Sequence, residues 1–300
     1  MPTPDLNGRV AVVTGAGAGL GRAHALALAR HGARVVLNDL AAPDGRLPAQ
    51  AVADEITAAG GQALALAGDV RDAAAMADLV ARTVAHWGRL DIVVNNAGIL
   101  RDRSFAKMDL ADFRSVLDVH LMGAVNLTHA AWPQMIAQRH GRVIFTTSSS
   151  GLYGNFGQSN YGAAKMALVG LMQTLALEGA KHGIHVNCLA PTAATAMTAD
   201  LLPPAALAAL TVERVSPAVV VLASDAAPTR MILAAGAGSF ESAHVTLTPG
   251  IHLPDGPQMA EALLLQLPAV LDRRGEQVPR QGYEQVAQAL GKAGVPPAAA

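Results

Sequence analysis

Short apolar runs alternate with helix-forming runs along the first half of the chain, and this alternation restricts the possible folds more than any other feature of the sequence. The apolar runs lack polar alternation, as expected for strands buried on both faces of a parallel sheet. We expect strands at Arg9–Thr14, Arg34–Asp39, Ala63–Ala67 and Leu90–Asn95. Between them we expect three helices, the first ending near His31 and the others at Gln50–Ala59 and Asp72–Trp87. This order predicts an α/β protein with a doubly wound parallel sheet and helices on both faces.

The second half of the chain adds further strands and then changes character. A β-branched and aromatic run at Val143–Thr147 predicts a buried strand, and a helix-forming run begins near Tyr161. The last apolar strand of the sheet is expected at Met231–Ala235. We predict one large domain at residues 1–250 and a C-terminal extension at 251–300 that packs on it, because about fifty residues are too few for an independent enzyme domain. The tail from Lys292 is expected to be disordered.

The composition argues against several classes of function. Lys and Arg (22) balance Asp and Glu (23) without a basic block, so nucleic-acid binding has no electrostatic support. Cys188 is the single cysteine, which fits a reducing compartment, and Cys and His lack the spacing of a metal site. The N-terminus lacks a signal-peptide pattern, and polar residues interrupt the longest apolar run. We therefore expect a cytoplasmic protein without a metal or a membrane span.

Three polar side chains near the middle of the chain suggest proton-transfer chemistry. Tyr161 and Lys165 are four residues apart and share one face of the predicted helix, and Ser148 lies where the preceding strand ends. Ionising a free tyrosine at pH 7 costs about 4 kcal/mol, and an ammonium ~4 Å away offsets about 4 kcal/mol near a protein surface. Lys165 can therefore make Tyr161 a proton donor or acceptor, with Ser148 holding the substrate oxygen. A buried aromatic residue, a surface lysine and a loop serine are the alternative unless the chain also builds a nucleotide site.

A glycine-rich turn between the first strand and the first helix is the candidate for that nucleotide site. Gly15, Gly19 and Gly21 let the backbone approach a pyrophosphate, although Leu20 stands where the strict Gly-x-Gly-x-x-Gly spacing requires its last glycine. Asp39 ends the second strand, where a carboxylate accepts hydrogen bonds from ribose hydroxyls and repels a 2′-phosphate. The sequence therefore predicts a Rossmann-type site that prefers NAD to NADP. A carboxylate that only caps a turn is the alternative for Asp39.

Four motifs in this order resemble those of the short-chain dehydrogenase/reductase family. They are Thr14-Gly15-x-x-x-Gly19-x-Gly21, Asn95-Asn96-Ala97-Gly98, Ser148 and Tyr161-x-x-x-Lys165. Within the family, the chain is most similar to the (3R)-hydroxyacyl-CoA dehydrogenase domains of peroxisomal multifunctional enzymes type 2, a branch in which hydroxysteroid dehydrogenase activity is also seen. The closer match lies in Gly15–Arg22, Val36–Leu40, Asn95–Phe105, Tyr153–Gln158 and Asn160–Tyr161, and the similarity runs from about Gly8 to Met197.

The resemblance implies a role for each matching residue. It implies Tyr161 as the general acid/base, Lys165 as the residue that lowers the pKa of Tyr161 and binds the nicotinamide ribose, and Ser148 as the group that orients the substrate. Further cofactor contacts are implied for Gly15, Gly19, Leu20, Gly21, Asp39, Asp69, Val70, Asn96, Ala97, Gly98, Pro191 and Thr195. The family usually has Asn where this chain has His120. We hypothesise that His120 keeps the family's proton relay to the lysine; a plain helix histidine is the alternative.

The resemblance also implies the substrate class and the assembly. The Ala- and Leu-rich segment Pro203–Leu210 matches the family's substrate lid and suggests an apolar acyl-CoA or sterol, with Arg101, Arg103 and Lys107 available for CoA phosphates. Family members pair through the helix after Tyr161, which implies a homodimer or homotetramer. We expect NAD-dependent interconversion of a secondary alcohol and a ketone, with a 3-hydroxyacyl-CoA as the first candidate. A hydroxysteroid dehydrogenase and a non-catalytic NAD(H)-binding protein are the alternatives.

Overall fold

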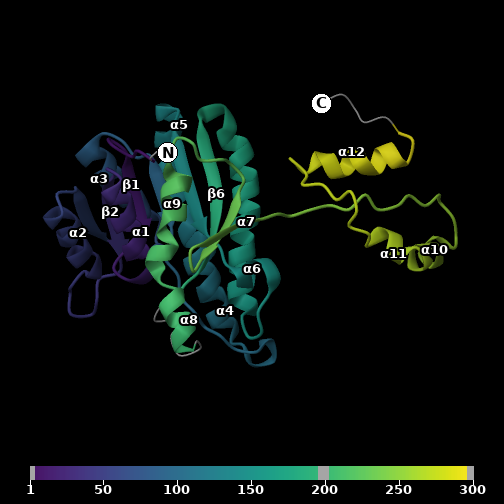
Figure 1. Cartoon of the computed structure of the whole chain (residues 1–300), viewed down its shortest axis with the longest axis horizontal. Helices are drawn as coiled ribbons and strands as arrows, with labels where there is room; N and C mark the ends of the chain where they lie inside the picture. The colour runs from purple at the N-terminus through teal and green to yellow at the C-terminus, as the bar shows by residue number, and fades with distance from the viewer. Residues whose placement is uncertain (1–3, 195–202, 296–300) are drawn as a thin grey trace. The chain divides into compact units, whose positions relative to one another are not determined.

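The structure, a computed structural model, describes residues 4–194 and 203–295 (Figure 1). The chain forms two compact units, residues 1–242 and 243–300, which are described separately. Among the described residues, no helix combines the length and the apolarity needed to cross a bilayer.

The N-terminal unit is built around an eight-stranded sheet. The strands are β1 (Val10–Thr14), β2 (Arg34–Asp39), β3 (Ala63–Ala67), β4 (Ile92–Asn95), β5 (Gly141–Thr146), β6 (Ile184–Thr192), β7 (Ile232–Gly236) and β8 (Ser239–Ala243). They lie in the order β3-β2-β1-β4-β5-β6-β7-β8, and the pairings from β3 to β7 are parallel. The strand order reverses between β1 and β4, which is where open α/β sheets bind ligands. The predicted doubly wound fold is confirmed.

Helices cover both faces of the sheet (Figure 1). One layer consists of α1 (Gly19–Arg30), α2 (Pro48–Ala58) and α9 (Ser216–Ala223). The other consists of α3 (Ala73–Trp87), α5 (Gly123–Gln138) and α7 (Ser159–Gly179), with α4 (Leu110–Leu117) against α7. The unit also contains the short helices α6 (Ser149–Tyr153) and α8 (Pro204–Ala209). The two helical layers explain why the strands are apolar at successive positions.

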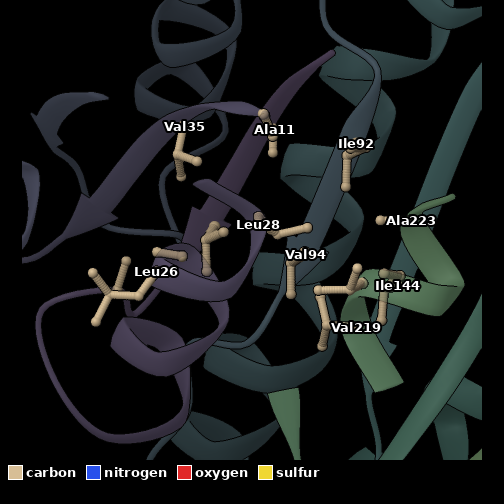
Figure 2. Packing of buried hydrophobic residues seen from close by; sticks show 14 of the residues in the cluster. Ala11, Leu26, Leu28, Val35, Ile92, Val94, Ile144, Val219 and Ala223 are labelled. Carbon is tan, nitrogen blue, oxygen red and sulfur yellow. The ribbon is translucent and has the colours of Figure 1, made fainter. Parts of the chain in front are cut away.

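The packing of the first layer is seen in Figure 2, where Leu26 and Leu28 of α1 and Val219 of α9 lie against the sheet. Val94 of β4 and Ile144 of β5 belong to the same buried cluster. On the next strand of the sheet, Cys188 is also fully buried. All five residues of β1 are buried, which agrees with the predicted burial on both faces.

The edge strand β8 was not predicted from the sequence. The strand expected at Met231–Ala235 matches β7 within one residue, but a two-residue turn then leads directly into β8. Both turn residues have positive φ angles, 53° at Ala237 and 85° at Gly238, as in the type I′ turns that connect antiparallel strands. β8 is exposed or half-buried along its whole length, so it has no apolar pattern from which it could be predicted.

The C-terminal unit contains α10 (Met259–Leu265), α11 (Leu267–Val270) and α12 (Tyr283–Lys292). An antiparallel bridge joins Leu247 to Gln277. None of residues 243–295 is buried. The predicted boundary after residue 250 and the packing of the extension on the larger domain stay predictions.

Candidate active site

The predicted site residues gather where β1, β4 and β5 end. These strands run parallel, so their carboxyl ends meet at one edge of the sheet. Thr14 ends β1, Asn95 ends β4 and Thr146 ends β5, and each is followed by one of the predicted motifs. The fold therefore brings together segments that lie about eighty and fifty residues apart in the chain.

The glycine-rich turn after β1 packs backbone against backbone. Gly15 and Gly19 have φ angles of 62° and 53°, which favour glycine. A Cβ atom on Gly15 would lie 2.9 Å from the Cα of Ala97, and one on Gly21 would lie 2.0 Å from the carbonyl oxygen of Gly15. Close contacts within the protein thus require Gly15 and Gly21, and the turn leaves a cradle at the N-terminus of α1 that suits a pyrophosphate.

Hydrogen bonds fasten the turn after β4 to this glycine turn. The Thr14 hydroxyl accepts from the backbone N–H groups of Asn96 and Ala97, each at 3.0 Å. The Asn96 amide donates to the carbonyl oxygens of Thr14 and Gly15 at 3.0 and 3.3 Å. Asn96 therefore shapes the nucleotide site by holding the glycine turn. Leu20, another predicted contact, is half-buried and packs against the core cluster.

A cleft of about 260 Å³ opens beside these turns. Six of the predicted cofactor residues line it, namely Gly15, Asp39, Asp69, Val70, Ala97 and Gly98. The Asp39 carboxylate accepts from the N–H groups of Gly17 and Leu40, each at 2.8 Å. Arg71 pairs with Asp69 and lowers the pKa of that carboxyl. The cleft thus combines a glycine cradle with a fixed carboxylate, a donor and acceptor set that fits a dinucleotide.

Three of the predicted catalytic residues, Ser148, Tyr161 and Lys165, lie together. Ser148 is the N-cap of α6 and its Oγ accepts from the backbone N–H of Ser150 at 3.1 Å. Tyr161 and Lys165 are one turn apart on α7, with Lys165 Nζ 5.4 Å from the centroid of the Tyr161 ring. The Lys165 ammonium donates to the carbonyl oxygen of Thr146 at 2.5 Å.

Burial dominates the ionisation of Tyr161 and Lys165. Burial raises the pKa of Tyr161, and the Ser148 hydroxyl beside the phenol acts in the opposite direction. Burial lowers the pKa of Lys165 to about 7. The expected lowering of the Tyr161 pKa by Lys165 therefore stays a prediction, and it requires the ammonium to turn from Thr146 toward the phenol.

His120 lies at the centre of a π-helical turn, η2 (Asp118–Met122), between α4 and α5. Its side chain is buried, and its Nε2 lies 2.8 Å from the carbonyl oxygen and 3.1 Å from the backbone nitrogen of Ile99. Burial, and then the charge of Lys165, lower the pKa of His120 to about 3. The proton relay hypothesised for His120 is not tested by these contacts.

Pro191 and Thr195 are the remaining predicted cofactor residues. Pro191 lies in β6, where it pairs with Ala235 of β7, and it does not line the cleft. Thr195 lies outside the described residues. Among the described residues, no three His, Cys, Asp or Glu side chains gather closely enough to hold a metal ion.

Two asparagines near the site were not among the predicted site residues. The Asn38 side chain donates to the carbonyl oxygens of Leu66 and Gly68 and lines the cleft. The Asn160 side chain donates to the carbonyl oxygen of Arg101 at 2.9 Å and accepts from the N–H of Tyr161 at 2.7 Å. Both asparagines lie in segments that carry the closer family match, Val36–Leu40 and Asn160–Tyr161, and this match was the available signal.

Comparisons with known proteins agree with this geometry. Residues 9–205 match the short chain dehydrogenase family. A peroxisomal hydratase-dehydrogenase-epimerase of Neurospora crassa is 49% identical over 226 residues, which cover 75% of this chain and 24% of that protein. A hydroxyacyl-CoA dehydrogenase of Mycobacterium tuberculosis is 46% identical over 211 residues, which cover 66% of this chain and 65% of that protein.

The solved structure of full-length peroxisomal multifunctional enzyme type 2 from Drosophila melanogaster superimposes with a TM-score of 0.81 and 36% identity, over 96% of this chain and 50% of that one. The chain thus spans only part of these larger relatives. The matches confirm the resemblance seen in the sequence, including its peroxisomal multifunctional branch. The chain therefore belongs to the short-chain dehydrogenase family of NAD(P)-binding oxidoreductases.

Proposed function

We propose that the protein is an NAD-dependent dehydrogenase that interconverts a 3-hydroxyacyl-CoA and the corresponding ketone. The observation that carries the proposal is the grouping of Ser148, Tyr161 and Lys165 next to a dinucleotide-type cleft. A protein that only binds NAD(H) has no need of a tyrosine for proton transfer, so this grouping argues against the non-catalytic alternative.

Each of the three residues has a separate task in this mechanism. Ser148 Oγ donates to the substrate oxygen and orients it. The phenolate of Tyr161 takes the proton of the substrate hydroxyl as the C–H bond breaks and the C=O bond forms. Lys165 stabilises the phenolate and holds the ribose hydroxyls of the nucleotide. NAD, when bound, supplies the hydride acceptor. In the reverse direction, Tyr161 returns the proton to the carbonyl oxygen.

The substrate class rests on the relatives and on the charges near the cleft. Relatives of this chain are named hydroxyacyl-CoA dehydrogenase and hydratase-dehydrogenase-epimerase. Arg101 lines the cleft, and its pairing with Asp112 at 3.6 Å joins two half-exposed side chains, which is a weak interaction in water. Arg101 is therefore available for a CoA phosphate, as are the exposed side chains of Arg103 and Lys107.

The direct test is NADH formation by the purified protein with a medium-chain (3R)-hydroxyacyl-CoA and with a 17β-hydroxysteroid, each with NAD and with NADP. We expect turnover of the CoA ester with NAD. Turnover of the steroid alone would make this protein a hydroxysteroid dehydrogenase. Binding of NAD without turnover of either substrate would contradict the proposed substrate class.

Replacement of Asp39 by Ala tests the cofactor preference. The variant is expected to lower kcat/KM with NAD by about 10- to 100-fold, because a hydrogen bond to a charged group contributes about 1.5–3 kcal/mol. Its kcat/KM with NADP is expected to rise, because the carboxylate no longer repels the 2′-phosphate. Arg22→Ala is the matched control, since Arg22 pairs with Glu55 at 2.6 Å and is expected to leave the NAD/NADP ratio unchanged. An unchanged ratio in Asp39→Ala would show that the carboxylate does not select the cofactor.

We also propose that the chain assembles as a homodimer or homotetramer through α7. Met166 and Leu177 on this helix are 39% and 48% exposed, although they are large and apolar. Sedimentation of the purified protein, compared with a Leu177→Glu variant, tests the assembly.

A cytoplasmic location remains our proposal. Relatives named peroxisomal supply the competing location, and cell fractionation with markers of both compartments distinguishes the two.

A further inference from the structure

The imidazole of His120 fills a slot between Gly98 and Tyr161. A Cβ atom on Gly98 would lie 2.3 Å from His120 Cε1, 3.0 Å from Nδ1 and 3.2 Å from Nε2, so the ring packs directly on the backbone at this glycine. On its other side, the ring meets Tyr161 edge-on, with ring centroids 5.2 Å apart and an interplanar angle of 87°. The imidazole therefore separates the wall of the nucleotide cleft from the phenol.

A hydrogen bond to Ile99 fixes the ring in this slot. Nε2 carries one proton or none, so it either donates to the carbonyl oxygen of Ile99 or accepts from its N–H. Both tautomers tie the ring to the residue that follows Gly98. The π-helical turn of η2 places His120 in a widened part of the helix, a feature that is frequent at functional sites.

The segment that begins at Gly98 is also held near Tyr161 at its other end, Arg101. Asn160 donates to the carbonyl oxygen of Arg101 and accepts from the backbone N–H of Tyr161. The segment from Gly98 to Arg101 is thus held at one end by His120 and at the other by the neighbour of Tyr161. Since Gly98 lines the nucleotide cleft, the position of the phenol relative to the cleft depends on these two side chains.

The ring acts without charge in this environment. Burial and the charge of Lys165 hold the pKa of His120 at about 3, far below the working range of an enzyme at neutral pH. Its shape and its bond to Ile99 are then the properties that matter. A proton relay through the main chain at position 120 would depend neither on the shape of the ring nor on its bond to Ile99.

We propose that His120 is a positioning residue whose neutral side chain sets the distance between the Tyr161 phenol and the Gly98 wall of the nucleotide cleft. The inference rests on the proposed dehydrogenase function, and it assigns to the side chain a task that the main chain at position 120 cannot perform. Its specific consequence is that the size of residue 98 and the size of residue 120 are coupled.

The test is a double-mutant cycle between Gly98→Ala and His120→Ala. The methyl group of Gly98→Ala clashes with the imidazole, and we expect kcat to fall by about 100-fold, the scale of a misplacement near 1 Å. His120→Ala is expected to lower kcat by about 10- to 100-fold. In the double variant, the space left by the ring accepts the methyl group, so Gly98→Ala is expected to cost only about threefold further. KM for NAD is expected to change little in His120→Ala.

Two conservative variants separate positioning from simple loss of structure. The side-chain amide of His120→Gln reaches the place of Nε2 and keeps the bond to Ile99, whereas that of His120→Asn reaches only the place of Nδ1. We expect the Gln variant to keep about tenfold more kcat than the Ala variant, and the Asn variant to resemble Ala. Equal kcat in wild type and His120→Ala, or an equal cost of Gly98→Ala in both backgrounds, would overturn the proposal.

A second readout needs no substrate. The ultraviolet titration of Tyr161, taken as the difference from a Tyr161→Phe protein, is expected to move to lower pH in His120→Ala, because removal of the ring admits water to the buried phenol. His120→Gln is expected to move it less. If the wild type failed to turn over any alcohol, the proposed function would be wrong, and this titration would still test the role of His120. A titration curve that is the same in the wild type and in His120→Ala would overturn the positioning role.

Discussion

Tyr161→Phe is expected to lower kcat for alcohol oxidation by about 10³-fold, while binding of NADH is retained. The substitution removes one oxygen and keeps the ring that packs against His120. General acid/base catalysis contributes about 10²- to 10⁴-fold, and the phenol is the group of the site placed to accept the substrate proton. Initial rates of NADH formation measure the loss, and fluorescence titration with NADH measures the binding.

Tyr153→Phe is the matched control for this substitution. Tyr153 is 76% exposed at the end of α6, and its loss is expected to leave the rate unchanged. Turnover in Tyr161→Phe at the rate of the wild type would exclude the phenol as the proton acceptor. A loss of NADH binding together with turnover would instead indicate that the phenol supports the cofactor site.

Two buried histidines, His24 and His120, are expected to make acid destabilise the folded protein by about 3 kcal/mol per pH unit between pH 6 and pH 4. His24 and His120 are both buried, and burial lowers their pKa values from 6.5 to about 3. Between these values, the unfolded chain binds a proton at each position and the folded chain does not. The contribution of these two residues to the free energy of unfolding is therefore complete above pH 6.5 and falls as the pH is lowered, by about 1.4 kcal/mol per unit for each group.

Urea unfolding at a series of pH values from 7.5 to 4.5 measures this slope. His24→Asn is the informative variant, because the Asn amide reaches the place of His24 Nδ1, which lies 2.9 Å from the Ser216 hydroxyl. The variant keeps a partner for Ser216 and removes one titrating group, so its slope is expected to be smaller by about 1.4 kcal/mol per pH unit. An identical slope in the two proteins would mean that His24 does not drive the acid unfolding.

The first strands of the sheet could be predicted from the sequence because burial on both faces leaves a continuous apolar run. β2 and β3 match their predicted ranges, and β1 differs by one residue. β4 begins at Ile92 rather than Leu90, and the Asp91 carboxylate before it accepts from the backbone N–H of Val10. That contact depends on a strand eighty residues away, so local pattern cannot reveal it. The same holds for β8, which is defined by its neighbour and not by its composition.

In the candidate site, too, some features could be predicted from local sequence and others depend on distant contacts. The glycines and Tyr161-x-x-x-Lys165 could be found because the chemistry requires particular residues at fixed spacings. The bond from Lys165 to the Thr146 carbonyl and the bond from Asn160 to the Arg101 carbonyl could not, since each joins a side chain to the backbone of a distant segment. The contact of His120 with Gly98 likewise depends on a helix and a turn that meet only in the folded chain.

Cys188 is a natural reporter of local opening of the sheet around it. The thiol lies on a strand flanked on both sides by other strands, it is fully buried, and burial raises its pKa. Thiol reagents attack the exposed thiolate, so the folded chain resists alkylation until this part of the sheet separates. Because the chain has no other cysteine, the rate of modification under native conditions reads the frequency of that separation directly, without any engineered label.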